Sequence, residues 1–273
     1  MKLAFSTLGC PEWSWEDILS TAKDFGFNGL EVRGIEHEIY TPLSRPFLYT
    51  NKAETLKTLD RLKLEIPCLS TACYLYDKTN YSNMIKEGEE YIDLANSINT
   101  PFVRVLGDKS PEPNLKIDID DEFVIENLRY LAAYAAKKNV KIIIETNGVY
   151  ADSKRIAKIV NKAAMPNIGI LWDVHHPYRY FSEMPMDTYN NIGEMLSFVH
   201  VKDSIINADG SIKYKMMGSG DVPVVDTISI LKKYNYTGYI SLEWVKRWYL
   251  DLEEPGVAFM QFVEFMKRQL GNN

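Results

Sequence analysis

Four apolar segments of this chain each run into a side chain that can bind a metal ion or move a proton. These side chains are Glu145, Asp173, His200 and Glu243. A buried strand that reaches the open end of a sheet presents its last side chains at that end. We therefore expect the four residues to stand at strand ends that meet.

Side-chain alternation along a strand indicates which way these residues point. Glu145, for example, shares a face with Ile143. If such faces point inward, three carboxylates and one imidazole crowd together. Carboxylates that lie so near one another resist being ionised at the same time, and burying an unpaired carboxylate costs free energy. A divalent cation relieves both problems, and mixed oxygen and imidazole donors suit Mn²⁺, Mg²⁺, Co²⁺ or Zn²⁺. The sequence therefore predicts one divalent metal ion, with iron left open.

Each residue also has a simpler interpretation. Taken singly, Glu145 could be a salt-bridged strand end, and His200 could be a hydrogen-bonded core histidine. The conjunction of four such groups at equivalent places on consecutive strands favours the metal site.

The elements that must position these residues alternate regularly. Short apolar segments predict strands at residues 2–6, 30–33, 66–71, 102–106, 141–145, 168–173, 198–201 and 239–242. Amphipathic segments predict helices at residues 14–25, 53–62, 82–98, 122–139, 153–164, 187–195, 224–234 and 255–270. Strict alternation of strand and helix is typical of a parallel sheet. Eight such units in ~250 residues match a (β/α)8 barrel, so we predict an α/β fold with one barrel domain over residues 1–273.

The alternative fold is a doubly wound open sheet. Such a sheet normally carries a phosphate-binding turn after a strand, and the sequence has no GxGxxG or P-loop motif. We expect residues 203–223 to form a long loop that contains Asp209-Gly210. Two helices have apolar stripes that should be buried. These stripes are Val124, Leu128, Leu131 and Ala135, and Phe259, Phe262, Val263 and Met266.

Composition limits the class of protein. The chain has 273 residues, of which 46% are hydrophobic and 25% charged, as in ordinary globular proteins. A net charge of −6 without a basic stripe disfavours a nucleic-acid partner. No segment approaches the ~18 apolar residues of a membrane helix. Three cysteines without a CxxC motif predict buried or loop thiols in a reducing compartment. We expect a cytoplasmic protein with no nucleic-acid or membrane partner, and leave a homo-oligomer open.

Short motifs are spread over nearly the whole chain. They are FNGLE ending at Glu31, ETN beginning at Glu145, WDVHH around Asp173, HVKD beginning at His200, GSGDV beginning at Gly218 and SLEW around Glu243. Their order and spacing together resemble the xylose-isomerase-like superfamily of barrels. That superfamily includes sugar isomerases and epimerases, inosose dehydratases and apurinic nucleases of the endonuclease IV type. The resemblance implies that the four strand-end residues are metal ligands and that His176 contacts substrate or a metal-bound oxygen.

The resemblance also implies a reaction. A small carbohydrate substrate would be isomerised or epimerised by carboxylate-mediated proton transfer through a metal-stabilised enediolate. Glu145 and Glu243 are the expected catalytic pair. The expected substrate-binding residues are His176, Lys202, Arg104 and Trp13.

Some of these residues have alternative partners. Lys202 should share the inward face of His200, where it could steady developing negative charge or pair with the surplus carboxylates. Glu31, Arg33 and Arg104 should also face inward, where they could pair with one another or contact substrate, and the sequence favours pairing.

Two departures from the superfamily pattern narrow the expected activity. Ketose 3-epimerases carry a further glutamate six residues after the first ligand, where this chain has Ala151. A trinuclear nuclease site needs many histidines, and the chain has four. The alternatives are a dehydratase of the inosose or dehydroshikimate type, then a phosphodiesterase or endonuclease, and then a sugar-binding protein without activity.

Overall fold

Eight parallel strands form a closed barrel in this computed structural model, which describes residues 1–113 and 118–271. The barrel strands are β1 (Lys2–Ser6), β2 (Gly29–Val32), β3 (Glu65–Tyr74), β4 (Phe102–Leu106), β5 (Lys141–Glu145), β6 (Ile168–Asp173), β7 (Leu196–Val201) and β10 (Tyr239–Leu242). Their order around the barrel is β1-β10-β7-β6-β5-β4-β3-β2, so barrel strands that follow one another along the chain lie side by side, and the last strand, β10, closes the barrel against the first, β1. The predicted (β/α)8 barrel is confirmed.

Helices follow the strands along the chain. They are α1 (Trp15–Phe25), α2 (Lys52–Leu62), α3 (Tyr81–Ser97), α4 (Asp121–Ala136), α5 (Ser153–Ala163), α6 (His175–Phe181), α7 (Pro185–Ile192), α8 (Val224–Lys233) and α9 (Pro255–Leu270). None of the helices in the described residues has both the length and the apolar character needed to cross a membrane. By contacts within the chain, two compact units can be distinguished. Unit 1 comprises Met1–Ile66 and Val199–Asn273, and unit 2 comprises Pro67–Phe198.

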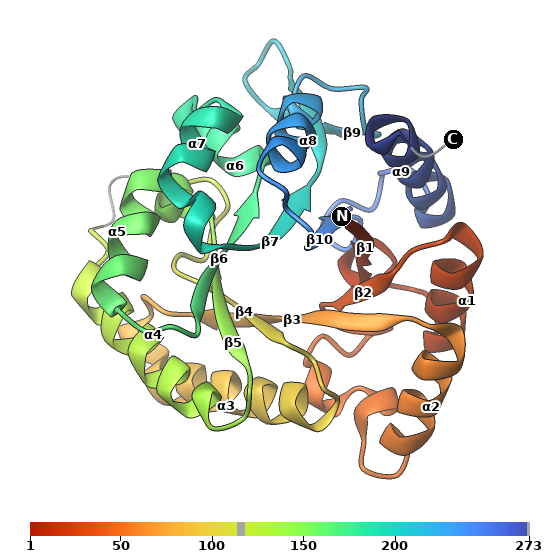
Figure 1. Cartoon of the computed structure of the whole chain (residues 1–273), viewed down its shortest axis with the longest axis horizontal. Coiled ribbons are helices and arrows are strands. Elements are labelled where there is room, and N and C mark those ends of the chain that lie inside the picture. Colours follow the sequence, from red (N-terminus) through yellow and green to blue (C-terminus); the bar gives the residue numbers. More distant parts are fainter. Residues whose placement is uncertain (114–117, 272–273) are drawn as a thin grey trace. The chain divides into compact units, whose positions relative to one another are not determined.

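Within unit 2, helix α4 lies between α3 and α5 and packs against β5 (Figure 1). Its predicted stripe of Val124, Leu128, Leu131 and Ala135 is fully buried. Strand β5 pairs with β4 on one side and β6 on the other, which brings Ile143 beside Arg104 and Glu145 beside Leu171. This packing fixes the ends of β5 and β6, where two of the predicted ligands stand.

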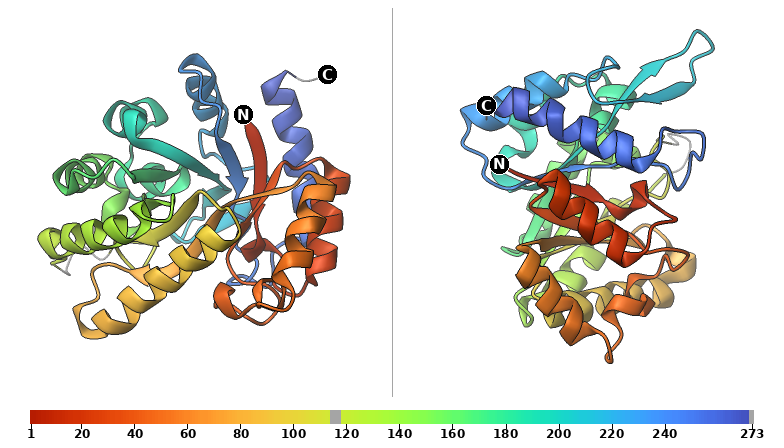
Figure 2. Two further views of the ribbon diagram at one scale, coloured as in Figure 1. Left: turned by 60° about the horizontal axis from the view of Figure 1, so that its bottom comes forward. Right: turned by 90° about the vertical axis from the view of Figure 1, so that its right-hand side faces the viewer.

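Within unit 1, the first and last helices of the chain are neighbours. Helix α1 contacts α9 (Figure 2), and strand β1 pairs with both β2 and β10. The predicted α9 stripe is buried, and the ring of Phe259 stacks on Phe5 with centroids 4.2 Å apart. Ser14 caps the N-terminus of α1, because its hydroxyl accepts a hydrogen bond from the Asp17 N–H at 3.1 Å.

One expectation about unit 1 is wrong. Residues 203–215 are not a loop but an antiparallel hairpin of β8 (Asp203–Ile206) and β9 (Ile212–Lys215), visible in Figure 2. The Asp209-Gly210 pair lies in its turn, where Gly210 has a φ of +84° that glycine adopts without strain. The predicted loop begins only after Lys215.

The three cysteines agree with the prediction. Cys10, Cys68 and Cys73 are free and buried. Burial raises the pKa of Cys10 and of Cys73 well above the usual thiol range, so both remain protonated at neutral pH.

Candidate metal centre

Each of the four predicted ligands stands at the carboxyl end of a barrel strand. In unit 2, Glu145 and Asp173 are the last residues of β5 and β6. In unit 1, His200 is the last residue but one of β7, and Glu243 directly follows β10. All four are buried. Buried charges are costly unless they are paired, so the contacts around each residue determine what it can do.

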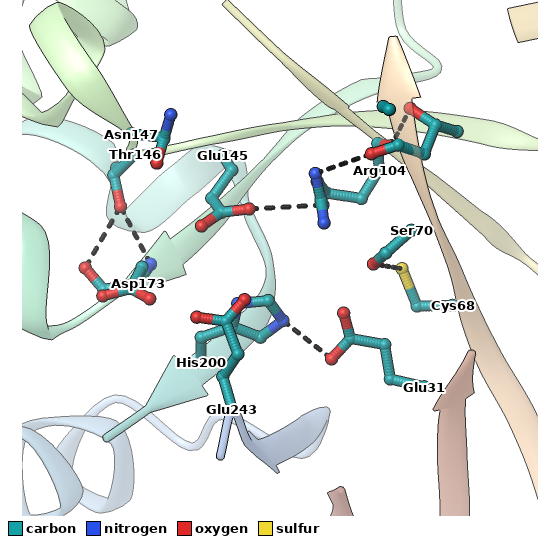
Figure 3. A network of polar contacts seen from close by, with 12 residues as sticks. Glu31, Cys68, Ser70, Arg104, Glu145, Thr146, Asn147, Asp173, His200 and Glu243 are labelled. Carbon is teal, nitrogen blue, oxygen red and sulfur yellow. Dashed lines mark hydrogen bonds and ion pairs between the residues drawn. The ribbon is translucent and has the colours of Figure 1, made fainter. Parts of the chain in front are cut away.

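Glu145 is paired with an arginine from the neighbouring strand. Arg104 Nε lies 3.2 Å from Glu145 Oε2 (Figure 3). Arg104 Nη1 donates a hydrogen bond to the Thr71 carbonyl at 3.0 Å. The Thr71 hydroxyl donates in turn to the Arg104 carbonyl at 2.9 Å. Arg104, for which both a substrate contact and an ion pair were open, therefore holds one of the two expected catalytic carboxylates.

Asp173 is held at the start of α6. Its Oδ1 accepts hydrogen bonds from the backbone N–H of His175 at 2.9 Å and of His176 at 3.1 Å. The Thr146 hydroxyl accepts from the Asp173 N–H at 2.8 Å and donates to the Asp173 carbonyl at 3.1 Å (Figure 3). These contacts fix both the backbone and the carboxylate at the end of β6.

His176 stands beside two of the predicted ligands. Its Nδ1 lies 3.9 Å from Glu145 Oε1 and 3.8 Å from Asp173 Oδ1. The same nitrogen lies 3.0 Å from the Thr146 carbonyl oxygen. Because a carbonyl can only accept, the neutral ring carries its proton on Nδ1 and its lone pair on Nε2.

His200 is held by a buried glutamate that lies far from it in the sequence. Its Nε2 is 2.7 Å from Glu31 Oε2 (Figure 3), and the Ser241 hydroxyl donates to the same oxygen at 2.8 Å. The other ring nitrogen, Nδ1, lies 3.6 Å from Glu243 Oε1. That distance is too long for a hydrogen bond. It is short enough for both atoms to bind one ion with bonds of about 2.1 Å.

Glu243 has a second buried partner. Lys202 Nζ lies 2.5 Å from Glu243 Oε2. Of the two roles expected for Lys202, this contact corresponds to pairing with a surplus carboxylate. The two oxygens of Glu243 thus face different groups, one the lysine and one the imidazole of His200.

The predicted ligands come together in one buried cluster. One ligand atom from each of Glu145, Asp173, His200 and Glu243 lies within 4.8 Å of those of the other three. A similarly close group of Asp173, His175 and His176 overlaps it. The described residues therefore contain an acidic and histidine cluster that could hold a metal ion.

The sequence of residues 19–269 matches the family model described as xylose isomerase-like TIM barrel. The chain belongs to the xylose isomerase-like TIM barrel family. This confirms the resemblance inferred from the motifs. No curated protein sequence matches the chain.

Solved structures of low sequence identity share this xylose isomerase-like fold. The probable 3-DHS dehydratase AsbF of Bacillus anthracis, involved in petrobactin synthesis, has a TM-score of 0.81 at 18% identity, covering 98% of this chain and 99% of that chain. The IOLI protein with a bound zinc atom has a TM-score of 0.80 at 15% identity, covering 99% and 98%. D-psicose 3-epimerase of Clostridium cellulolyticum, solved with D-tagatose, has a TM-score of 0.76 at 16% identity, covering 98% of each chain. At such identities the likeness establishes the fold alone.

The residues of this xylose isomerase-like barrel fit a divalent cation. Four carboxylates are buried here, those of Glu31, Glu145, Asp173 and Glu243, with Arg104 beside Glu145 and Lys202 beside Glu243. A bound cation would offset the excess negative charge. Carboxylate oxygens combined with one imidazole nitrogen suit Mg²⁺, Mn²⁺, Co²⁺ or Zn²⁺.

Trp13 lies in the loop after β1 and is partly exposed. Its ring packs edge-on against Phe259, with centroids 5.6 Å apart. This contact joins the loop to helix α9. A role for Trp13 in substrate binding stays a prediction.

Sequence reasoning did not find the contact between Glu31 and His200. The sequence suggested arginine partners for Glu31 but gave no sign of its contacts to His200 and Ser241, which span 169 and 210 residues of sequence. Arg33 Nη1 donates to the Ile39 carbonyl at 3.3 Å. The position of Glu31 at the end of the FNGLE motif showed that it is a strand-end acid. Nothing in one sequence indicates which distant strand supplies its partner.

Proposed function

We propose that this xylose isomerase-like barrel is a divalent-metal-dependent isomerase or epimerase that acts on a sugar or sugar derivative. The observation that carries the proposal is the buried cluster in which Glu145 and Glu243 accompany Asp173 and His200. Two carboxylates beside a cation site can move protons while the site holds the substrate's oxygens.

In this proposal Glu145, Asp173, His200 and Glu243 hold the ion. When bound, a divalent cation polarises a carbonyl group and makes the neighbouring C–H more acidic. Glu145 removes that proton, with its carboxylate oriented by Arg104 at 3.2 Å. Positioned acid–base catalysis of this kind contributes roughly 10²–10⁴-fold.

Glu243 returns the proton to a different face or a different carbon. Its Oε2 is anchored by Lys202 at 2.5 Å, which fixes the direction in which the carboxylate points. His176 receives a substrate hydroxyl through its Nε2 lone pair, and Trp13 covers an apolar face of the sugar.

The test combines metal content with proton exchange. Elemental analysis of the purified protein should find one divalent ion per chain. In deuterated water, a panel of ketoses and aldoses should gain deuterium at the carbon next to the carbonyl, and a chelator should stop this exchange. No metal-dependent exchange or interconversion with any sugar of a broad panel would rule the proposal out.

Dehydration is the second candidate function. Ala151 occupies the position at which the superfamily's ketose 3-epimerases carry a glutamate, and it is fully buried in the turn Gly148–Ala151. A dehydratase begins with the same proton removal and then expels hydroxide from the adjacent carbon, so the substrate loses one water. Appearance of an enone absorbance together with the mass loss of one water would favour this reaction over isomerisation.

A further inference from the structure

Glu31 is a buried acid whose contacts point to the candidate metal centre. It stands near the end of β2 and is fully buried, as is His200. Its Oε2 lies 2.7 Å from His200 Nε2, within the range of a strong charge-assisted hydrogen bond (Figure 3). Glu31 itself is not among the four candidate metal ligands.

This contact determines where the proton of the His200 ring lies. An ionised carboxylate can only accept, so Nε2 must donate and therefore carries a proton. In the neutral ring the lone pair is then on Nδ1, the nitrogen that lies 3.6 Å from Glu243 Oε1. An imidazole binds a metal through the nitrogen that has the lone pair.

A second donor fixes the glutamate. The Ser241 hydroxyl donates to Glu31 Oε2 at 2.8 Å, so two donors converge on one carboxylate oxygen. Ser241 pairs in register with His200 across β10 and β7, so their side chains lie on the same face of the sheet. The Glu31 side chain is therefore restricted to a rotamer that keeps its carboxylate in contact with the imidazole of His200.

We propose that Glu31 is a positioning residue that fixes the ring orientation and the tautomer of His200, so that Nδ1 is the atom that binds the cation. The proposal rests on the proposed function to the extent that an ion binds at this site. Carboxylates that hold a metal-binding histidine in this way also make the imidazole a stronger donor, and losing them typically costs about 10–100-fold in metal affinity.

The experiment compares Glu31→Gln and Glu31→Ala with wild type. Glu65→Gln is the matched control, because Glu65 is also a hydrogen-bonded glutamate of unit 1 but is partnered by Lys2 and Tyr239. Affinity for Mn²⁺ or Zn²⁺ alone is measured by competition with a chromophoric chelator. Long-range ¹H–¹⁵N spectra of the metal-free proteins report which nitrogen of His200 is protonated, with the signal assigned by its loss in His200→Asn.

The wild type should show His200 protonated on Nε2 even without metal. Glu31→Gln should keep this tautomer, because the amide oxygen can still accept, but should lose metal affinity about 10-fold. Glu31→Ala should show a mixture of tautomers and lose about 100-fold. Glu65→Gln should match the wild type in both measurements.

The outcomes separate this proposal from the proposed function. If the wild type binds no ion, the proposed function fails, while the spectra of the metal-free proteins still test the role of Glu31. If the wild type binds an ion and both variants bind it as tightly, with an unchanged His200 spectrum, the role of Glu31 is refuted. Should Glu31→Ala not fold, Glu31→Gln decides, since it preserves the shape and one acceptor.

Discussion

Among single residues, the carboxylates of Glu145 and Glu243 differ in the basic side chain with which each is paired. Glu145 is paired with Arg104 and Glu243 with Lys202. We predict that Glu145→Gln and Glu243→Gln each lower turnover by roughly 10²–10⁴-fold, because an amide cannot take up the substrate's proton. The measurement is the rate of deuterium incorporation, with circular dichroism to verify folding. Full activity in either variant would refute its catalytic role.

A substitution at Arg104 separates positioning from substrate binding. Arg104 contacts both Glu145 and the Thr71 carbonyl through different nitrogens, which the single ammonium group of a lysine cannot reproduce. Hydrogen bonds to charged groups contribute about 1.5–3 kcal/mol. We therefore predict that Arg104→Lys lowers kcat by roughly 10–100-fold and leaves KM nearly unchanged. Steady-state kinetics give the answer, since a rise in KM at constant kcat would instead identify Arg104 as a substrate contact.

The sequence was informative about which residues end the strands, and less so about what they contact. Short apolar segments that end in an acid or a histidine were sufficient to identify Glu145, Asp173, His200 and Glu243 as residues at strand ends. The contact of Glu31 with His200 could not be predicted, because it depends on the closure of strands that are 169 residues apart. The pairing of Arg104 with Glu145 was missed for a related reason, since it depends on the register between β4 and β5.

At the scale of elements, the segment after β7 is organised by one aspartate. Asp203 Oδ2 accepts from the backbone N–H of Gly218 and Gly220, both at 2.9 Å, and its Oδ1 accepts from Ser204 and Val222. Burial raises the pKa of Asp203, while these four hydrogen bonds act in the opposite direction. The carboxylate thus ties the hairpin strand β8 to the GSGDV segment.

We predict that Asp203→Asn destabilises the protein by at least about 1–3 kcal/mol, because an amide nitrogen cannot accept from buried N–H groups. Chemical denaturation measures the loss. Asp209→Asn is the control, since Asp209 lies in the exposed hairpin turn and bonds only locally to Ser211. A change within about 0.5 kcal/mol is expected there. Equal stability of the two variants would contradict the organising role of Asp203.

The bounds of most barrel strands follow from short apolar segments of the sequence, although β3 (Glu65–Tyr74) is longer than the predicted 66–71. Five predicted strands, 2–6, 102–106, 141–145, 168–173 and 239–242, have the observed bounds. The β8–β9 hairpin was missed because its strands have four residues each and lie partly exposed, so neither carries a strong apolar pattern. Helix α6 was missed because its seven residues give less than the two turns needed to recognise a helical period.

At the scale of the whole molecule, we propose that the chain unfolds as a single domain, although two compact units can be distinguished within it. The slowest backbone amides of β1 and β10 in unit 1 and of β5 and β6 in unit 2 should then exchange with the same opening free energy. Denaturant-dependent hydrogen exchange measures this. Two groups of amides with different free energies and different denaturant slopes would instead indicate two separately folding domains.

The pairing of β1 with β10 has a consequence for synthesis of the chain on the ribosome. Unit 2 is continuous in sequence, whereas unit 1 takes strands from both ends. During synthesis, one edge of β1 therefore stays unpaired until residues 239–242, which form β10, have left the exit tunnel. An exposed apolar edge of this kind is an aggregation hazard. If translation stops before β10, the edge of β1 stays unpaired. We expect chaperones and proteases to recognise an incomplete chain by this exposed edge.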